Sequence, residues 1–126
     1  MGFTCQLRSD SYANAMSVSS VRSFVGDNQL AISQVIPPAT TNLEILAAID
    51  ISQLKMLVMQ SDVALTLKTN SSASPANTIN LAAGIPYIWG TGDYNALLLT
   101  TDVAKFFVTV AGAVEANLQI LALVDV

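Results

Sequence analysis

The chain has 126 residues, of which 52% are hydrophobic and only 11% are charged, and its formal net charge is −4. The length indicates one domain. The five Lys and Arg residues are spread along the chain, which argues against nucleic acid as a partner, because a phosphate backbone is bound by clustered basic side chains.

Catalysis and metal binding are restricted by the residue types that are missing. Histidine is absent and Cys5 is the single cysteine. A Ser-His-Asp or Cys-His catalytic arrangement is therefore impossible, and one cysteine forms neither an intrachain disulfide nor a cysteine-rich zinc site. The apolar runs are shorter than the roughly 18 residues of a transmembrane helix. We therefore expect a protein that is not an enzyme, with no cofactor, no metal and no membrane partner.

The N-terminal part of the sequence predicts strands with irregular patterns. Residues 1–14 are compatible with a projecting arm or with the first strand of the domain, and we treat the two as equal alternatives. Residues 15–25 are rich in Val and Ser. After the turn signal Gly26-Asp27-Asn28, a strand is predicted over residues 29–36, and Pro37-Pro38 ends it.

The remaining segments alternate more regularly. Residues 54–60 fit a strand or a short helix, and we predict a strand because the segment is too short for a typical helix. Residues 117–124 are apolar on both faces, as in a strand that is covered on both sides. A single helical turn is predicted over residues 99–106, with Thr100 or Thr101 as its cap and Asp102 near its start. The other predicted strands cover residues 43–51, 63–68, 78–81, 86–89 and 105–110.

These segments define the predicted fold. About eight or nine short strands at this spacing predict an all-β protein, a single-domain antiparallel β-sandwich. The sandwich is expected to span residues 15–126. The polar stretch of residues 70–77, which lacks charge and histidine, is predicted to be a loop between two antiparallel strands.

The acidic residues lie mostly one to a turn. Asp50 and Asp62 border the segment ISQLKMLVMQS, and Asp93 lies in the glycine-rich GTGDY. Two such loops could form a calcium or substrate site, but turn-forming Asp is the interpretation that we favour. Gly90 and Gly92 are predicted to supply positive φ angles where the chain leaves the preceding strand.

Two aromatic residues are the main candidates for a contact surface. Tyr87 and Trp89 are two positions apart and so share one face of their strand. If they are exposed they could bind a partner, since Trp and Tyr are enriched at binding hot spots. If they are buried they belong to the core, and the sequence leaves both possibilities open.

The second half of the chain resembles a known group of proteins. The blocks that carry the resemblance are IDISQLK, LKTNSSASPANTINL, PYIWGTGDY, LLTTDVAKFFVT and the closing LQILALVDV. Through them residues 43–126, and more loosely the N-terminal part, resemble small virion proteins of tailed bacteriophages. The resemblance implies a jelly-roll capsid decoration (cement) protein. Such a protein is made in the host cytoplasm and lies on the outer surface of the capsid as a homo-dimer or homo-trimer, where it bridges neighbouring major capsid protein subunits.

The alternative function is a host-surface or carbohydrate-binding module of a phage tail or fibre. It would use Tyr87, Trp89 and Tyr94 as a stacking platform beside Asp93. For the capsid role we expect contacts through the N-terminal segment, which could add to the sheet edge of a neighbour. The candidate interface residues are Phe3, Leu7, Arg8, Tyr12, Tyr87, Trp89 and Tyr94.

Overall fold

The computed structural model describes residues 3–13 and 16–125, with the backbone alone for residues 3, 9–13 and 16–20. Within this part of the chain there are ten strands and no helix. The strands are β1 (Phe3–Ala13), β2 (Met16–Gly26), β3 (Asn28–Ile36), β4 (Thr40–Ile49), β5 (Leu54–Ser61), β6 (Leu65–Thr69), β7 (Thr78–Leu81), β8 (Tyr87–Gly90), β9 (Val103–Val110) and β10 (Ala116–Val124).

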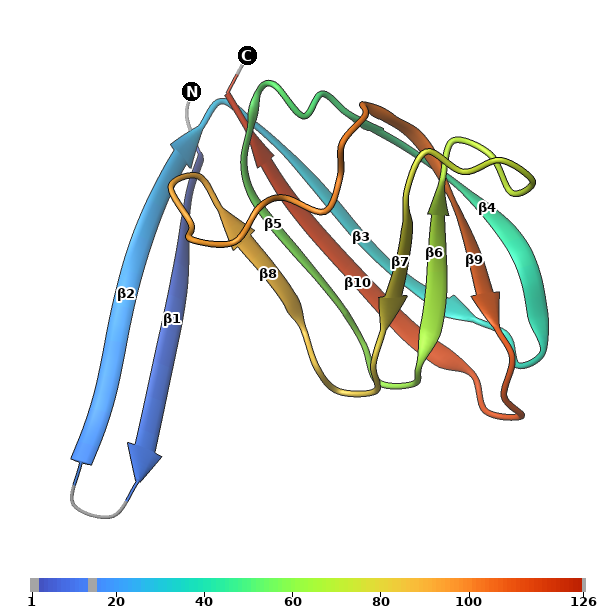
Figure 1. Cartoon of the computed structure of the whole chain (residues 1–126), viewed down its shortest axis with the longest axis horizontal. Helices are drawn as coiled ribbons and strands as arrows, with labels where there is room; N and C mark the ends of the chain where they lie inside the picture. The colour runs from blue at the N-terminus through green and yellow to red at the C-terminus, as the bar shows by residue number, and fades with distance from the viewer. Residues whose placement is uncertain (1–2, 14–15, 126) are drawn as a thin grey trace.

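Eight of these strands form a sandwich of two four-stranded sheets (Figure 1). The first sheet has the order β3-β10-β5-β8 and the second sheet has the order β4-β9-β6-β7, and every pairing is antiparallel. This interleaved order of two four-stranded sheets is the jelly roll. The predicted antiparallel, jelly-roll-like sandwich is therefore confirmed.

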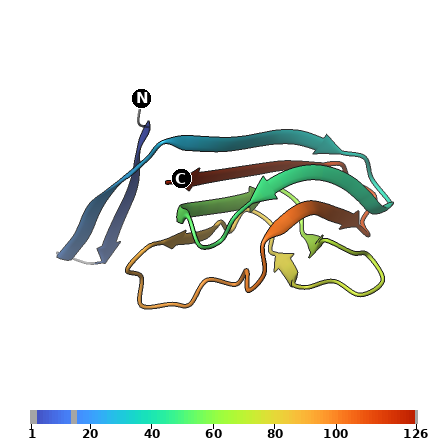
Figure 2. The same cartoon turned by 90° about the horizontal axis from the view of Figure 1, so that it is seen from above.

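The other two strands form a hairpin outside both sheets. β1 pairs with β2 along its whole length, from Phe3 opposite Gly26 to Ala13 opposite Met16. The hairpin, called the arm below, projects beyond the sandwich in Figures 1 and 2. The sandwich itself begins at β3, so residues 16–26, which the sequence analysis placed in the sandwich domain, belong to the arm.

The core lies between the two sheets and follows from strand alternation. In β9, Phe106, Val108 and Val110 are fully buried while the residues between them are partly exposed. In β10, Leu118 and Ile120 point into the core, whereas Leu123 lies on the opposite face and is also fully buried. The predicted covering of this strand on both sides is thus confirmed at its C-terminal end.

The predicted helical turn at residues 99–106 is wrong. Residues 99–102 are irregular and β9 begins at Val103. The polar groups expected to cap a helix bind other loops instead. The hydroxyl oxygen of Thr100 accepts from Asn77 Nδ2 at 3.0 Å, and Asp102 Oδ1 accepts from the N–H of Ile51 at 3.0 Å.

The polar stretch of residues 70–77 joins the antiparallel strands β6 and β7, as predicted. Asn70 has a φ of 68° and its side chain binds the start of β9. Its Nδ2 donates to the carbonyl of Asp102 at 2.8 Å, and its Oδ1 accepts from the N–H of Ala104 at 2.7 Å. Asn77 Nδ2 donates to Thr100 Oγ1 at 3.0 Å. These amides attach the loop to the end of the sandwich.

Candidate interaction surface

The base of the arm is packed on the outer face of the first sheet. Phe24 is 8% exposed and forms a small cluster with Met56 of β5 and Leu123 of β10. Cys5 and Leu7 of β1 pack against the same cluster. The arm therefore contributes a second, smaller core on the far side of the sheet from the main one.

Gly90 makes room for the Phe24 ring. A Cβ atom at this position would lie 2.3 Å from Phe24 Cζ, closer than real contacts allow. Gly90 does not have a positive φ, so the sequence-based explanation is wrong for this residue, and the requirement is close approach. Gly92 does have a positive φ, of 90°, as predicted.

An ion pair joins the arm to the β8–β9 loop. Arg22 of β2 pairs with Asp93, and its guanidinium carbon lies 5.3 Å from the centroid of the Phe24 ring. Asp93 Oδ2 also accepts a hydrogen bond from the N–H of Gly90 at 3.0 Å. The hydrogen bond from Arg22 is the main cause that lowers the pKa of Asp93, followed by the bond from Gly90. Asp93 thus fixes the arm beside the sheet.

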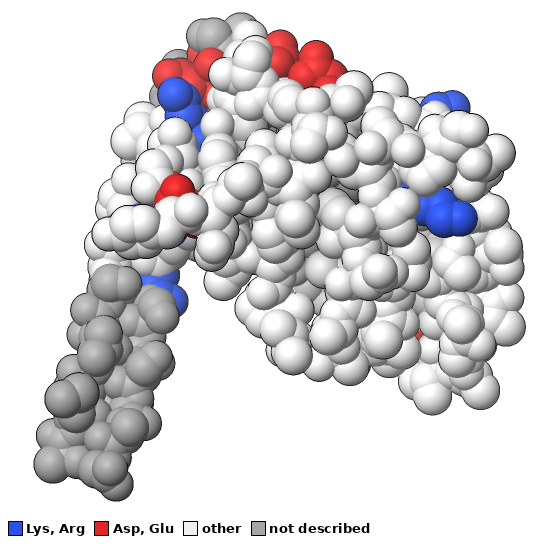
Figure 3. All heavy atoms as spheres, viewed as in Figure 1, with Lys and Arg blue, Asp and Glu red and all other residues white. Residues whose placement is uncertain are grey.

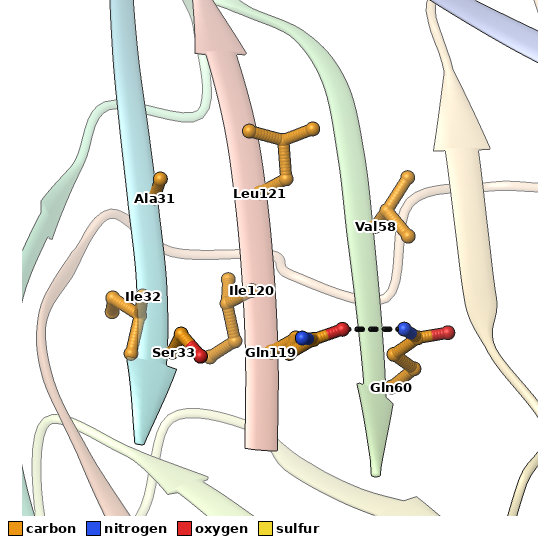
Figure 4. Close-up of a pocket in the computed structure, with 8 residues that line it drawn as sticks. All are labelled: Ala31, Ile32, Ser33, Val58, Gln60, Gln119, Ile120 and Leu121. Atoms are coloured by element: carbon orange, nitrogen blue, oxygen red, sulfur yellow. Dashed lines mark hydrogen bonds between the residues drawn. The ribbon is translucent and has the colours of Figure 1, made fainter. Parts of the chain in front are cut away.

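A groove lies on the outer face of the first sheet (Figure 4), next to the cluster at the base of the arm. This groove, called the outer groove below, has a volume of about 350 Å³. None of the residues that line it is ionisable. Its lining residues Val58 and Leu121 also pack against the Phe24 cluster. The other lining residues are Ala31, Ser33, Gln60 and Gln119, together with Ile32 and Ile120, whose side chains pack toward the main core.

The far end of the outer groove is polar. Gln60 Nε2 donates to Gln119 Oε1 at 2.6 Å, as Figure 4 shows. These two residues also line a second hollow of about 240 Å³, beside Asp62 and Asn117. Asp62 accepts from the backbone N–H and from Nδ2 of Asn117 at 2.7 and 2.8 Å, and these bonds lower its pKa. The surface therefore changes from apolar near the arm to amide-rich at the opposite end.

The outer face of the second sheet has a different character. Lys105 Nζ lies 3.5 Å from Glu44 Oε1 and 5.7 Å from the centroid of the Phe107 ring. Thr66 Oγ1 donates to Asn80 Oδ1 at 2.9 Å. In the view of Figure 3, acidic side chains gather along the upper edge of the molecule, and most of the remaining visible surface is uncharged. The outer face of the second sheet thus carries an ion pair, whereas no ionisable residue lines the outer groove.

The aromatic candidates are divided between the core and solvent. Tyr87 and Trp89 share one face of β8, as predicted, and that face packs half-buried against the main core. The N–H of Leu98 donates to the hydroxyl oxygen of Tyr87 at 3.1 Å, and burial raises the pKa of that hydroxyl. Tyr94 lies in the following loop and is fully exposed. The structure therefore does not place all three rings on an open face.

The N-terminal candidates lie on β1. Leu7 is half-buried at the base of the arm, whereas Arg8 is exposed. Of Phe3 and Tyr12 the structure describes the backbone alone. Sequence reasoning missed Arg22, Phe24 and the outer groove. A lone aromatic residue in a segment of Val and Ser was the one available signal for Phe24.

Asp50 acts in a turn, as the sequence analysis favoured, whereas Asp62, Asp93 and Asp102 also bind groups that are distant in the sequence. Asp50 Oδ1 accepts from the N–H and the hydroxyl of Ser52, at 3.0 and 2.6 Å. Within residues 3–13 and 16–125, no three His, Cys, Asp or Glu side chains gather closely enough to hold a metal ion. This part of the chain also contains no helix with the length and hydropathy needed to span a bilayer.

Comparisons with known proteins give one distant likeness. No family model and no curated protein matches the chain. Among solved structures, it is similar to a protein of Bacillus endospore appendages, which form disulfide-linked pili. The identity is 12% and the TM-score is 0.43, over 100% of this chain and 92% of the other. At this distance the likeness carries no inference about function.

Proposed function

We propose that this protein is a structural component of a bacteriophage particle that binds the outer surface of the capsid and stabilises it by bridging neighbouring major capsid protein subunits. The observation that supports the proposal best is the outer groove with the arm beside it, a surface without ionisable side chains along the groove. The resemblance of residues 43–126 to capsid decoration proteins names the partner that such a surface would contact.

The arm and the outer groove suit a bridging role. The arm is held at its base by Phe24 and by the Arg22–Asp93 pair, and the rest of it projects from the sandwich (Figure 1). A bridging protein needs two separate contact regions, and the sandwich and the arm provide them. Each contact can be weak, because many copies acting on one shell multiply the total binding, as in other multivalent assemblies.

The alternative, a carbohydrate-binding module, has less support. A stacking platform needs aromatic rings that lie open on the surface, and Tyr87 and Trp89 instead pack half-buried against the core. Tyr94 alone among the three is fully exposed. A glycan array probed with the purified protein addresses this alternative directly, and glycan binding that Trp89→Ala abolishes would favour it over the capsid role.

The capsid role is tested with shells of the phage that encodes the protein, prepared without it. We expect the purified protein to co-sediment with these shells and to raise the temperature at which they open. Leu121→Lys places a charge in the outer groove and should weaken binding, whereas Thr66→Lys, on the outer face of the second sheet, is the matched control. A wild-type protein that leaves the shells unbound would refute the proposal.

A further inference from the structure

The first sheet ends in an unprotected edge, the free side of β3. Natural edge strands are kept from pairing by charges, proline, bulges or shortness. β3 has nine residues, Asn28–Ile36, none of them charged and none of them proline. Its register with β10 runs without a shift from Asn28 opposite Val124 to Ile36 opposite Ala116. None of the usual protective devices is present along this strand.

The other edge strands of the sandwich are protected. β4 has two register shifts against β9, a positive φ at Asn42, and the charged residue Glu44. β7 and β8 have four residues each. In Figure 2, β3 forms one margin of the sandwich, and the arm leads away from it toward the opposite side. The contrast singles out β3 as an edge that is open to another strand.

The hydrogen-bond pattern shows which backbone groups of β3 face outward. The N–H of Asp125 donates to the carbonyl of Gln53, which turns Asp125 toward β5 and Val124 toward β3. Consistently, the carbonyl of Val124 accepts from the N–H of Asp27. Successive residues of a strand alternate in this respect, so the even-numbered residues of β10 face β3. The register places them opposite the even-numbered residues of β3, from Asn28 to Ile36. The N–H and C=O groups of Gln29, Ala31, Ser33 and Val35 are directed to the free edge.

We propose that two copies of this chain associate through β3, antiparallel and about a twofold axis at Ile32. The four outward-facing residues are symmetric about this position. Ala31 of one copy then pairs with Ser33 of the other, and Gln29 pairs with Val35. The N–H of Gln29, which donates to Asn28 Oδ1 at 2.9 Å in the single chain, would exchange that acceptor for the carbonyl of Val35. No charge meets a like charge in this arrangement, which is the self-complementary geometry of a twofold interface.

The side chains of β3 fit the same arrangement. Leu30 and Ile32 point toward the main core but are only partly buried, because β3 is the last strand of its sheet. A second copy would cover them. Val35 is 51% exposed on the outer face, and Ala31 and Ser33 are small enough to face each other closely. The two first sheets would become one continuous sheet with two outer grooves on the same side.

This inference rests on the proposed function and deepens it, because a dimer with paired grooves could contact two capsid subunits at once.

The first experiment is sedimentation equilibrium of the wild-type protein and of Ser33→Pro. Ser33 is exposed, and proline there removes an outward-facing N–H and places a ring at the edge. We expect a wild-type dimer and a weakening of about tenfold or more in the variant.

Asn80→Pro is the matched control on the edge strand β7. The N–H of Thr69 donates to the carbonyl of Asn77, so alternation directs the N–H of Asn80 to solvent, and this variant should dimerise like the wild type. If Ser33→Pro fails to fold, hydrogen exchange of the wild type tests the dimer instead. The amides of Ala31 and Ser33 must then become protected from exchange as the protein concentration rises.

Three outcomes overturn the inference: a monomeric wild type, an unchanged dimer in folded Ser33→Pro, or exchange at Ala31 and Ser33 that is independent of concentration. Shell binding separates this inference from the proposed function. If the protein binds shells as a monomer, the dimer inference is refuted and the capsid role is not. If the protein forms a β3 dimer that does not bind shells, the capsid role is refuted and the dimer inference is not.

Discussion

Arg22 of the arm and Asp93 of the β8–β9 loop form an ion pair across the junction between the arm and the sandwich. The same arginine lies over the ring of Phe24, which is the apolar contact of that junction. Asp93 in turn accepts from the N–H of Gly90, the residue whose missing side chain admits the Phe24 ring. Charge, packing and backbone thus act together at one point to set the direction of the arm.

The first prediction concerns pH. The pKa of Asp93 is lower in the folded protein than its ordinary value of 3.8, chiefly because of Arg22. Its stabilising contribution is therefore complete above that ordinary value and is lost as the pH falls through the lower folded pKa. We expect the Phe24 ring resonances to shift in NMR spectra as the pH is lowered from about 6 to 2, because the arm loosens when Asp93 is protonated.

Asp93→Asn should remove this pH dependence and stabilise the arm less at neutral pH, by at most about 1 kcal/mol, as for other exposed ion pairs. Asp62→Asn is the control. Asp62 also has a lowered pKa, but its partner is Asn117, at the opposite end of the outer groove. A Phe24 shift that persists in Asp93→Asn and disappears in Asp62→Asn would contradict the assignment.

The second prediction concerns Gly90. Gly90→Ala would bring a methyl group into the Phe24 ring and should destabilise the protein by about 1–3 kcal/mol, the usual cost of overpacking. Urea unfolding measures the change. Gly112→Ala is the control, since a Cβ there meets nothing within 4 Å. In a Phe24→Ala background Gly90→Ala should cost much less, and equal costs in both backgrounds would show that the ring is not the obstacle.

The sandwich could be predicted well from the sequence because each strand is identified by the pattern of its own residues. Alternation alone locates the buried residues Phe106, Val108, Leu118 and Ile120, since each strand carries its own pattern of apolar and polar residues. The turn function of Asp50 follows in the same way from its near neighbour Ser52. These features require no knowledge of which strands pair.

The junction of the arm could not be predicted in the same way, because its residues are distant in sequence. Nothing near Arg22 indicates Asp93, and nothing near Gly90 indicates Phe24. The wrong helical turn has a similar origin. Thr100 and Asp102 are ordinary capping residues, but in the folded protein their polar groups form hydrogen bonds with Asn77 and Ile51 instead. Pairing between distant segments overrides local preference at these positions.

The third prediction concerns Asn70, which combines a positive φ with two side-chain hydrogen bonds to the start of β9. Asn70→Ala loses both bonds and retains the strained backbone, and should cost about 2–4 kcal/mol. Asn70→Gly loses the bonds but tolerates the backbone, so it should cost less. Thermal unfolding of the two variants separates the contribution of the hydrogen bonds from that of the backbone strain. A glycine variant as unstable as the alanine variant would assign the whole effect to the hydrogen bonds.

The last prediction compares two phenylalanines. Phe106 is fully buried in the main core, whereas Phe24 belongs to the small cluster between the arm and the outer face of the first sheet. Phe106→Ala should reduce the free energy of unfolding by about 3–5 kcal/mol and increase hydrogen exchange throughout the sandwich.

Phe24→Ala should instead increase exchange mainly at the amides of β1 and β2, because an isolated two-stranded hairpin is marginally stable once its packing is lost. The amides of β9 and β6, which lie in the second sheet, should keep their protection. Residue-resolved hydrogen exchange measures both effects in one experiment. If Phe24→Ala lowers protection in β9 as much as in β2, the arm and the sandwich unfold as one unit, and the smaller cluster is an extension of the main core.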